Sequence, residues 1–278
     1  MSKFNFISLN IVLTKRQQLY IAVGGLIFFL LVWYLITKTG LVSSGVLPSP
    51  WDVTMAFVQL LTNQDEWIIG NLRIEMSSLI YNTGYSIVLN VVGYLEAIIA
   101  SLLFGFLIGL FPFFRSLLSR YIDAIRFIPL AAVTGLFVAW FGIEFNMKMQ
   151  FLAFGIFVFL LPVVVQRIDE VDKIYKQTAY TLGATDWQTI RYVYWPHVLS
   201  KLIDDIRVLT AISWTYIIVA ELINAESGIG KLIHMARRQS QLDQVFALLI
   251  VIILVGILQD ILFRMVDKKI NPFKYVKL

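Results

Sequence analysis

Side chains that commonly carry catalysis or bind metals are scarce in this sequence. It contains two histidines, His197 and His234, and no cysteine. The membrane spans inferred below put the two histidines on opposite sides, so they cannot share one metal ion, and no nucleophile is paired with a base. Without cysteine the chain has neither thiolate ligands nor disulfides. The sequence therefore predicts no catalytic residue, no metal site and no cofactor in this chain.

The most regular pattern of polar residues is the stretch AYTLGATDWQTIRYVYWP, residues 179–196. Gly183 is suited to end a first helix in a left-handed turn. Thr185 and the glutamine three residues later match a capping box for a second helix, and Asp186 adds negative charge at its N-terminus. Pro196 is expected to end that second helix. Two short helices joined at a glycine predict a rigid knob.

Aromatic side chains are interleaved with the polar ones on this predicted knob, at Tyr175, Tyr180, Trp187 and Tyr192. Exposed aromatic clusters commonly mark a surface that binds a partner. They are equally typical of an aromatic belt in the headgroup region of a membrane. The residues alone leave both interpretations open.

The rest of the chain predicts what must position this knob. Of its 278 residues, 59% are hydrophobic and only 15% are charged, and the mean hydropathy is +0.78. Soluble domains carry about 25% charged residues. We therefore expect an integral membrane protein, with no removable signal peptide. The pI of 9.3 is then attributed to basic cytoplasmic loops rather than to nucleic-acid binding.

Apolar runs approach or exceed the roughly 20 residues that cross a hydrocarbon core. Six spans with both termini on one side place 17 of the 23 Lys and Arg residues on that side, so the positive-inside rule predicts cytoplasmic termini. The alternative, that the third and fourth runs form a buried hairpin, would make the charge asymmetry a coincidence. The expected fold is all-α and polytopic, with spans at about residues 19–36, 91–111, 127–141, 149–165, 208–223 and 245–263.

Residues 38–90 form a long outer segment ahead of the second span. Ser49 is expected to cap an amphipathic helix that starts at Pro50, and residues 68–89 show the periodicity of a second one. Residues 166–204 form the cytoplasmic loop that carries the knob. The chain is interpreted as one membrane domain.

Polar residues inside the spans are candidates for a solute pathway. Glu96 is either a pathway residue or a carboxylate wetted at the outer interface, since a carboxylate deep in hydrocarbon costs at least about 2.5 kcal/mol. The fifth span has a polar stripe that either lines the pathway or bonds back to the helix backbone: Thr210, Ser213, Trp214 and Ile217.

The second span has small residues at every fourth position, at Ala97, Ser101, Gly105 and Gly109. This pattern lets helix backbones approach closely. Packing within the subunit is favoured over a dimer contact.

The outer end of the fifth span combines Glu221 with two nearby glycines, Gly228 and Gly230. The glycines permit a tight turn, and the Glu221 carboxylate can accept hydrogen bonds from the backbone amides of that turn. Basic residues follow, against the positive-inside trend, and they indicate headgroup contact, attraction of an anionic solute or docking of an acidic partner: Lys231, Arg237 and Arg238.

The polar loop also resembles the EAA signature of ATP-binding-cassette (ABC) importer permeases. Ala179, Gly183, Val193 and Pro196 stand at the matching spacing. The sequence departs from the signature at Gln177, Thr178 and Trp195, where the family prefers Glu, Ala and Leu.

Four further stretches resemble a narrower group, the sulfonate, nitrate, taurine and bicarbonate permeases. They are LPSP at 47–50, IRFIPLAAV at 125–133, WFGIEFNMK at 140–148, and VAEL followed by SGIGKLI. The third stretch lacks a second glycine that this group has. The resemblance covers roughly residues 40–265.

This resemblance implies a type I importer fold in the bacterial inner membrane, with two copies of the chain forming the pathway. It also implies two separate ATPase subunits that bind ATP and Mg, and this chain itself contains no Walker motif. A periplasmic or lipid-anchored binding protein would deliver a small anionic or zwitterionic solute. The ATPase-coupling residues would be Gln177, Thr178, Ala179, Gly183, Ala184, Thr185, Asp186, Trp187, Val193 and Pro196.

A proton- or ion-coupled secondary transporter or channel is the competing class. Such proteins usually carry several intramembrane ionisable groups or paired broken helices. Here only Glu96 is an intramembrane ionisable group, and the cytoplasmic loop with its two short predicted helices would have no role in such a protein.

Overall fold

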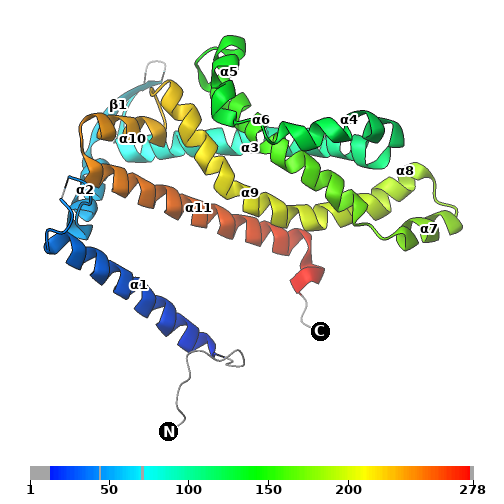
Figure 1. Ribbon diagram of the computed structural model, residues 1–278, viewed down its shortest axis with the longest axis horizontal. Helices are drawn as coiled ribbons and strands as arrows, with labels where there is room; N and C mark the ends of the chain where they lie inside the picture. The colour runs from blue at the N-terminus through cyan, green and yellow to red at the C-terminus, as the bar shows by residue number, and fades with distance from the viewer. Residues whose placement is uncertain (1–12, 44, 70–71, 276–278) are drawn as a thin grey trace, which may run out of the picture.

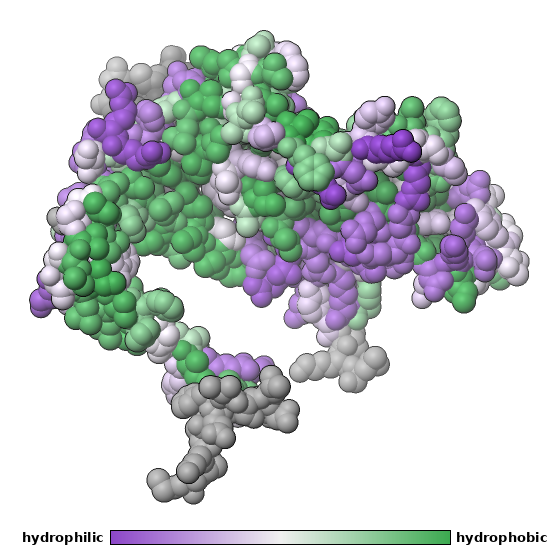
Figure 2. All heavy atoms as spheres, viewed as in Figure 1, coloured by the Kyte–Doolittle hydropathy of each residue, from purple (hydrophilic) through white to green (hydrophobic). Residues whose placement is uncertain are grey.

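The computed structural model describes residues 13–43, 45–69 and 72–275. Apart from one two-stranded hairpin, the regular structure in these residues is helical. Figure 1 shows the long helices running between two ends of the molecule, with α7 and α8 at one end and α2, α10 and the hairpin at the other. Hydrophobic side chains cover much of the bundle and α1, and hydrophilic ones gather toward the α7–α8 end and around α10 (Figure 2). This distribution is that of a multi-pass membrane protein.

Five described helices are long and apolar enough to cross a membrane, and a bent helix pair raises the number to six. The five confirm the first, second, fourth, fifth and sixth predicted spans, although several begin or end elsewhere than expected. They are α1 (Lys15–Lys38), α3 (Ser78–Leu110), α6 (Phe145–Asp169), α9 (Trp195–Ile223) and α11 (Leu242–Ile270).

The third predicted span is not a straight helix over 127–141. Helix α4 (Pro112–Ile125) is followed by a 3-10 turn, η1 (Leu130–Val133), and the short helix α5 (Thr134–Phe141). The two helical parts are bent by 98°. Pro129 lies at the bend, and proline both lacks a backbone N–H and disfavours helix in the residue before it.

The outer segment agrees with the sequence in its first half only. Helix α2 (Pro50–Thr62) starts where predicted, and the Ser49 hydroxyl accepts from the Asp52 N–H at 3.2 Å. The predicted second helix over 68–89 is wrong in its first part, because β1 (Gln64–Ile69) and β2 (Leu72–Ser77) pair as an antiparallel hairpin. The sequence between the strands is Gly-Asn, a turn-forming pair.

Helix α3 therefore begins at Ser78, well before the expected start of the second span at residue 91. Its 33 residues extend about 50 Å, more than the roughly 30 Å of a hydrocarbon core. Glu96 therefore lies near the middle of α3 and not at the outer end of the helix.

The core is formed mainly where α3, α6 and α9 pack together. A Cβ added at Gly105 would stand 2.4 Å from Val164 of α6, and one added at Gly109 would stand 2.6 Å from Ile168. Both distances are shorter than van der Waals contact permits. The small-residue stripe of the second span therefore packs within the subunit, as predicted.

Helix α1 stands apart from this core and has no buried residue. Near its end the Trp33 indole N–H donates to the Pro48 carbonyl at 3.0 Å, and its ring lies 6.0 Å from that of Phe246. Figure 1 shows the remainder of α1 diverging from the bundle.

Candidate coupling knob and pathway site

The polar loop folds into two short helices joined at a glycine, as the sequence predicts. Helix α7 (Lys173–Thr181) is capped by Asp172, whose carboxylate accepts from the Ile174 N–H at 2.9 Å. Gly183 has φ of +80°, the left-handed region that glycine adopts without strain. Its N–H donates to the Tyr180 carbonyl at 2.9 Å. Backbone geometry thus fixes the direction in which the chain leaves α7.

Helix α8 (Asp186–Thr189) begins with the predicted capping box. The Thr185 N–H donates to the Gln188 side-chain oxygen at 2.8 Å, and the Gln188 N–H donates to the Thr185 hydroxyl at 3.3 Å. The Tyr180 hydroxyl of α7 donates to the Asp186 carboxylate at 2.7 Å, and this bond raises the pKa of Tyr180. A side-chain bond therefore joins the two knob helices in addition to the glycine turn.

Pro196 does not end the second helix, contrary to the sequence prediction. A π-helical segment, η2 (Ile190–Tyr194), leads from α8 into α9, and the Trp195 N–H donates to the Ile190 carbonyl. A π turn is wider than an α turn and bonds five residues back. Pro196 is the second residue of α9, which directly follows this π-helical segment. The knob is consequently continuous with a helix that crosses the membrane.

An ion-pair network ties the ends of α6 and α9 together beside the knob. Arg167 makes a bidentate ion pair with Asp205, in which Nε and Nη2 each lie 2.7 Å from a carboxylate oxygen. Its Nη1 also donates to a Glu170 carboxylate oxygen at 2.7 Å. Lys201 reaches the same Glu170 carboxylate at 2.9 Å. Bonds from Lys201 and Arg167 lower the pKa of Glu170 to about 2. Arg115 of α4 adds a pair with Asp169.

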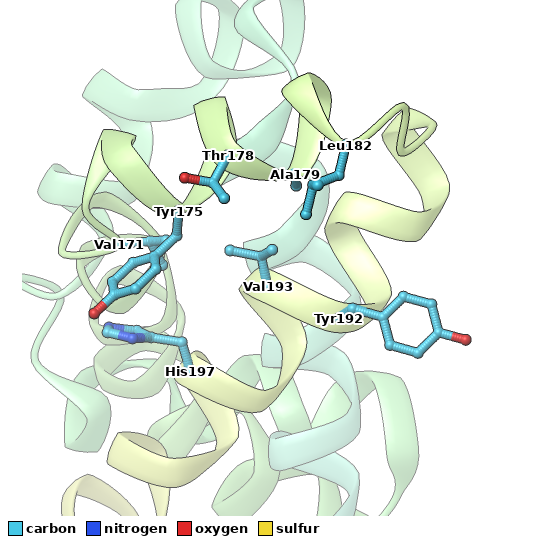
Figure 3. Close-up of a pocket in the computed structure, with 8 residues that line it drawn as sticks. All are labelled: Val171, Tyr175, Thr178, Ala179, Leu182, Tyr192, Val193 and His197. Carbon is cyan, nitrogen blue, oxygen red and sulfur yellow. The ribbon is translucent and has the colours of Figure 1, made fainter.

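The knob exposes large apolar side chains. Leu182 is 81% exposed and Trp187 is 70% exposed. Between α7 and the start of α9 lies a groove of about 370 Å³ (Figure 3), in which Val193 faces Ala179 and His197 lies beside Tyr175. Of the other predicted coupling residues, Gln177, Thr178, Thr185, Asp186 and Pro196 are exposed, whereas Ala184 is half-buried.

The polar stripe predicted on the fifth span faces the core rather than an open surface. The Ser213 hydroxyl is bonded to Asn90 of α3, and the Trp214 indole N–H donates to Gln259 of α11 at 2.8 Å. The Thr210 hydroxyl donates to the Ile206 carbonyl of its own helix. The polar groups on this face bond to neighbouring helices and to the backbone of α9, in line with the second of the two predicted alternatives, and a pathway-lining role stays a prediction. The buried set is Thr210, Ser213, Trp214 and Ile217.

Glu96 is the predicted pathway residue that the structure leaves accessible. It is half-buried, and the Gln150 amide of α6 donates to its carboxylate at 2.8 Å. Its position near the middle of α3 favours the pathway alternative over wetting at the outer interface, and the pathway role stays a prediction.

A buried polar cluster lies at the outer end of the bundle around Glu221. Its carboxylate is fully buried and accepts from the Gly230 N–H at 2.7 Å, which confirms the predicted contact with the glycine turn. The Ser86 hydroxyl bonds both Glu221 and the Ile229 N–H, and Asn82 accepts from Gly228 at 2.9 Å.

Lys148 is also buried in this outer region, and its ammonium group donates to the Asn224 carbonyl at 2.9 Å. Neither Lys148 nor the polar stripe of α3, formed by Asn82, Ser86 and Asn90, was predicted from the sequence. For the stripe, the spacing of four residues within an apolar helix was the available signal, whereas Lys148 had no local signal.

Helix α10 (Ile229–Arg238) carries the basic residues predicted for docking. Arg237 and Arg238 are exposed at its C-terminus, where cations favour the helix dipole. Lys231 is half-buried and lines a polar pocket of about 450 Å³ with Asn63 and Gln241.

Comparison with known proteins identifies the class. The chain matches the family described as binding-protein-dependent transport system inner membrane component over residues 97–272, and it belongs to that family. It is therefore a multi-pass inner-membrane protein and the permease subunit of an ABC importer.

Two named relatives cover most of the chain. It is 30% identical to the putative aliphatic sulfonates transport permease protein SsuC of Bacillus subtilis, over 87% of this chain and 83% of that protein. It is 26% identical to the taurine transport system permease protein TauC of Escherichia coli, over 92% of this chain and 90% of that protein.

Solved structures agree on the fold. An inward-facing form of the MetNI methionine ABC transporter matches with a TM-score of 0.59 at 14% identity, over 70% of this chain and 96% of that one. An amino acid ABC transporter matches with a TM-score of 0.52 at 18% identity, over 69% and 91%. The fold is that of a type I ABC importer permease.

Proposed function

We propose that two copies of this chain form the membrane pathway of an importer for small sulfonate-type solutes, driven by two ATPase subunits docked on α7 and α8. The solute class is inferred from the relatives named for aliphatic sulfonates and taurine. A separate binding protein would deliver the solute at the opposite end of the molecule.

The observation that carries the proposal is the construction of the knob. The glycine turn, the Thr185 capping box and the bond from Tyr180 to Asp186 hold α7 and α8 in one arrangement. Because α8 continues through η2 into α9, a displacement of the knob moves a membrane helix with it. A flexible loop would absorb such a displacement, and this rigid one transmits it.

The surface chemistry of the knob supports docking of a protein. Trp187, Leu182 and Tyr192 project from one compact polar structure. Buried aromatic anchors carry much of the binding energy at protein interfaces. We assign the knob to the ATPase interface.

The outer end is the proposed surface for the binding protein. Arg237 and Arg238 are exposed there, and clustered positive charge accelerates association with an acidic partner. A change of both arginines to Gln should weaken association with the binding protein at low salt.

Two tryptophans of nearly equal exposure give a matched test of the docking assignment. Trp187 on the knob is 70% exposed, and Trp51 on α2 at the opposite end is 69% exposed. Trp187→Ala should reduce copurification of the ATPase at least about tenfold, as removal of a central aromatic anchor does. Trp51→Ala should retain the ATPase. Equal retention by both variants would contradict the assignment.

A further inference from the structure

A groove of about 360 Å³ opens beside Glu96, where α3, α5 and α6 meet. Two of its lining residues are polar, Glu96 and Gln150, and six are aromatic. Trp140 and Phe104 are 65% and 49% exposed, so ring surface is accessible from the groove. The groove therefore combines one carboxylate with several aromatic faces.

The carboxylate of Glu96 is only partly satisfied. The Gln150 amide nitrogen lies 2.8 and 3.1 Å from its two oxygens, and no other residue of the described chain bonds to it. A carboxylate offers about four acceptor positions. An incoming donor can thus bind without displacing Gln150.

The depth of Glu96 requires that this groove face protein or water. Glu96 lies in the apolar part of α3, a helix of 33 residues. Ionisable residues at such depth face a bundle interior or an aqueous cavity, because hydrocarbon does not solvate them. We therefore expect the groove to face protein or water rather than lipid.

We infer that this groove is a transit site for the ammonium group of a solute that carries both an ammonium and an anionic group. A primary ammonium donates up to three hydrogen bonds, which suits a carboxylate with free acceptor positions. Aromatic faces attract the same cation through their quadrupole. A solute with only an anionic group would be repelled by Glu96. The inference rests on the proposed function and refines its solute class to zwitterions.

A matched pair of probes isolates the ammonium group, namely 2-aminoethanesulfonate and ethanesulfonate. Binding would be measured by saturation-transfer NMR on the permease–ATPase complex, without binding protein, in nanodiscs of phosphatidylglycerol. These discs contain no amine headgroup that would compete. The aminosulfonate should bind the wild-type complex, and ethanesulfonate should bind at least about tenfold more weakly, the value of one charge-assisted hydrogen bond.

Three variants make the test specific. Glu96→Gln should weaken aminosulfonate binding about tenfold or more, and Glu96→Asp should restore part of it. Glu144→Gln removes a carboxylate that is exposed and outside the groove, so it should leave binding unchanged. Adding phosphatidylethanolamine should not reduce binding, whereas competition by this lipid would assign the groove to a headgroup.

The inference is overturned if the wild-type complex does not distinguish the two probes, or if Glu96→Gln binds the aminosulfonate as well as wild type does. In parallel, ATP-dependent uptake of each probe is measured in the presence of the binding protein. If the wild-type complex imports neither probe while the aminosulfonate still binds at Glu96, the proposed function is wrong but the assignment of the groove as an ammonium site stands. If the complex imports the aminosulfonate but does not distinguish the two probes at Glu96, the assignment of the groove is wrong and the proposed function stands.

Discussion

The Glu221 carboxylate accepts a hydrogen bond from the backbone N–H of Gly230, with nitrogen and oxygen 2.7 Å apart. Its other oxygen accepts from the Ser86 hydroxyl, so one buried side chain joins α9, α3 and the start of α10. A buried carboxylate needs such partners, since leaving it unpaired would be costly. The outer end of the permease is therefore held by a side chain that folds back onto its own following turn.

We expect Gly228→Ala to disrupt this arrangement. Gly228 has φ of +99°, and a Cβ there would stand 2.1 Å from a Glu221 carboxylate oxygen. Backbone strain of this kind costs about 1–3 kcal/mol, and displacement of the carboxylate adds to it. The apparent melting temperature in detergent should fall by several degrees. The control is Gly256→Ala on α11, where the added Cβ meets nothing within 4 Å, and an equal loss in both variants would contradict this account.

The ion-pair network beside the knob should give a specific pH dependence. Because the pKa of Glu170 is lowered from 4.5 to about 2, the unfolded chain binds more protons between these values. The stabilisation from Glu170 is fully present above about pH 4.5 and is lost as the pH falls toward 2. Replacing Glu170 with Gln should flatten the dependence of the melting temperature over this interval.

Thermal unfolding in detergent at a series of pH values from about 2 to 6 measures this effect. Asp123→Asn is the control, because Asp123 is exposed and makes no ion pair in the described residues. If Glu170→Gln and wild type lose stability in parallel, the network does not stabilise the junction of α6 and α9.

The glycine turn of the knob can be tested with two substitutions at Gly183, one that excludes its backbone conformation and one that tolerates it. Gly183→Pro is incompatible with φ of +80°, since proline fixes φ near −65°, and it removes the N–H that bonds Tyr180. We expect at least about tenfold loss of ATPase binding and of stimulated ATP hydrolysis, since proline in an incompatible position costs about 3 kcal/mol or more.

Gly183→Asn is the rescuing variant, because asparagine tolerates the left-handed region. A Cβ at this position meets nothing within 4 Å, so the side chain has room. Binding and hydrolysis should stay near the wild-type values. If the proline variant couples normally, the knob geometry is irrelevant to function.

The features of the fold that the sequence predicted correctly are local ones. The caps at Ser49 and Thr185 and the turn at Gly183 depend on residues within four positions of each other, so their patterns are decisive. The hairpin before Ser78 and the bend at Pro129 were missed, because apolar periodicity alone did not distinguish a strand pair from a helix or a broken span from a straight one.

The predicted pathway residues show why a site is harder to predict than a cap. Thr210 and Ser213 form a polar stripe in either case, and only the packing of α9 against α3 decides that this stripe is buried. The depth of Glu96 likewise depends on where α3 begins. Lys148 pairs with a carbonyl 76 residues away, a relation that no local pattern encodes.

The energy source for uptake decides whether this chain works as an ATP-driven permease. Proteoliposomes would contain the permease, its ATPase and the binding protein, with 2-aminoethanesulfonate as solute. We expect uptake to require ATP on the side of the membrane where the ATPase is docked, and to persist when ionophores collapse the proton and sodium gradients. Uptake by the permease alone that is driven by an ion gradient, without ATPase or ATP, would contradict it.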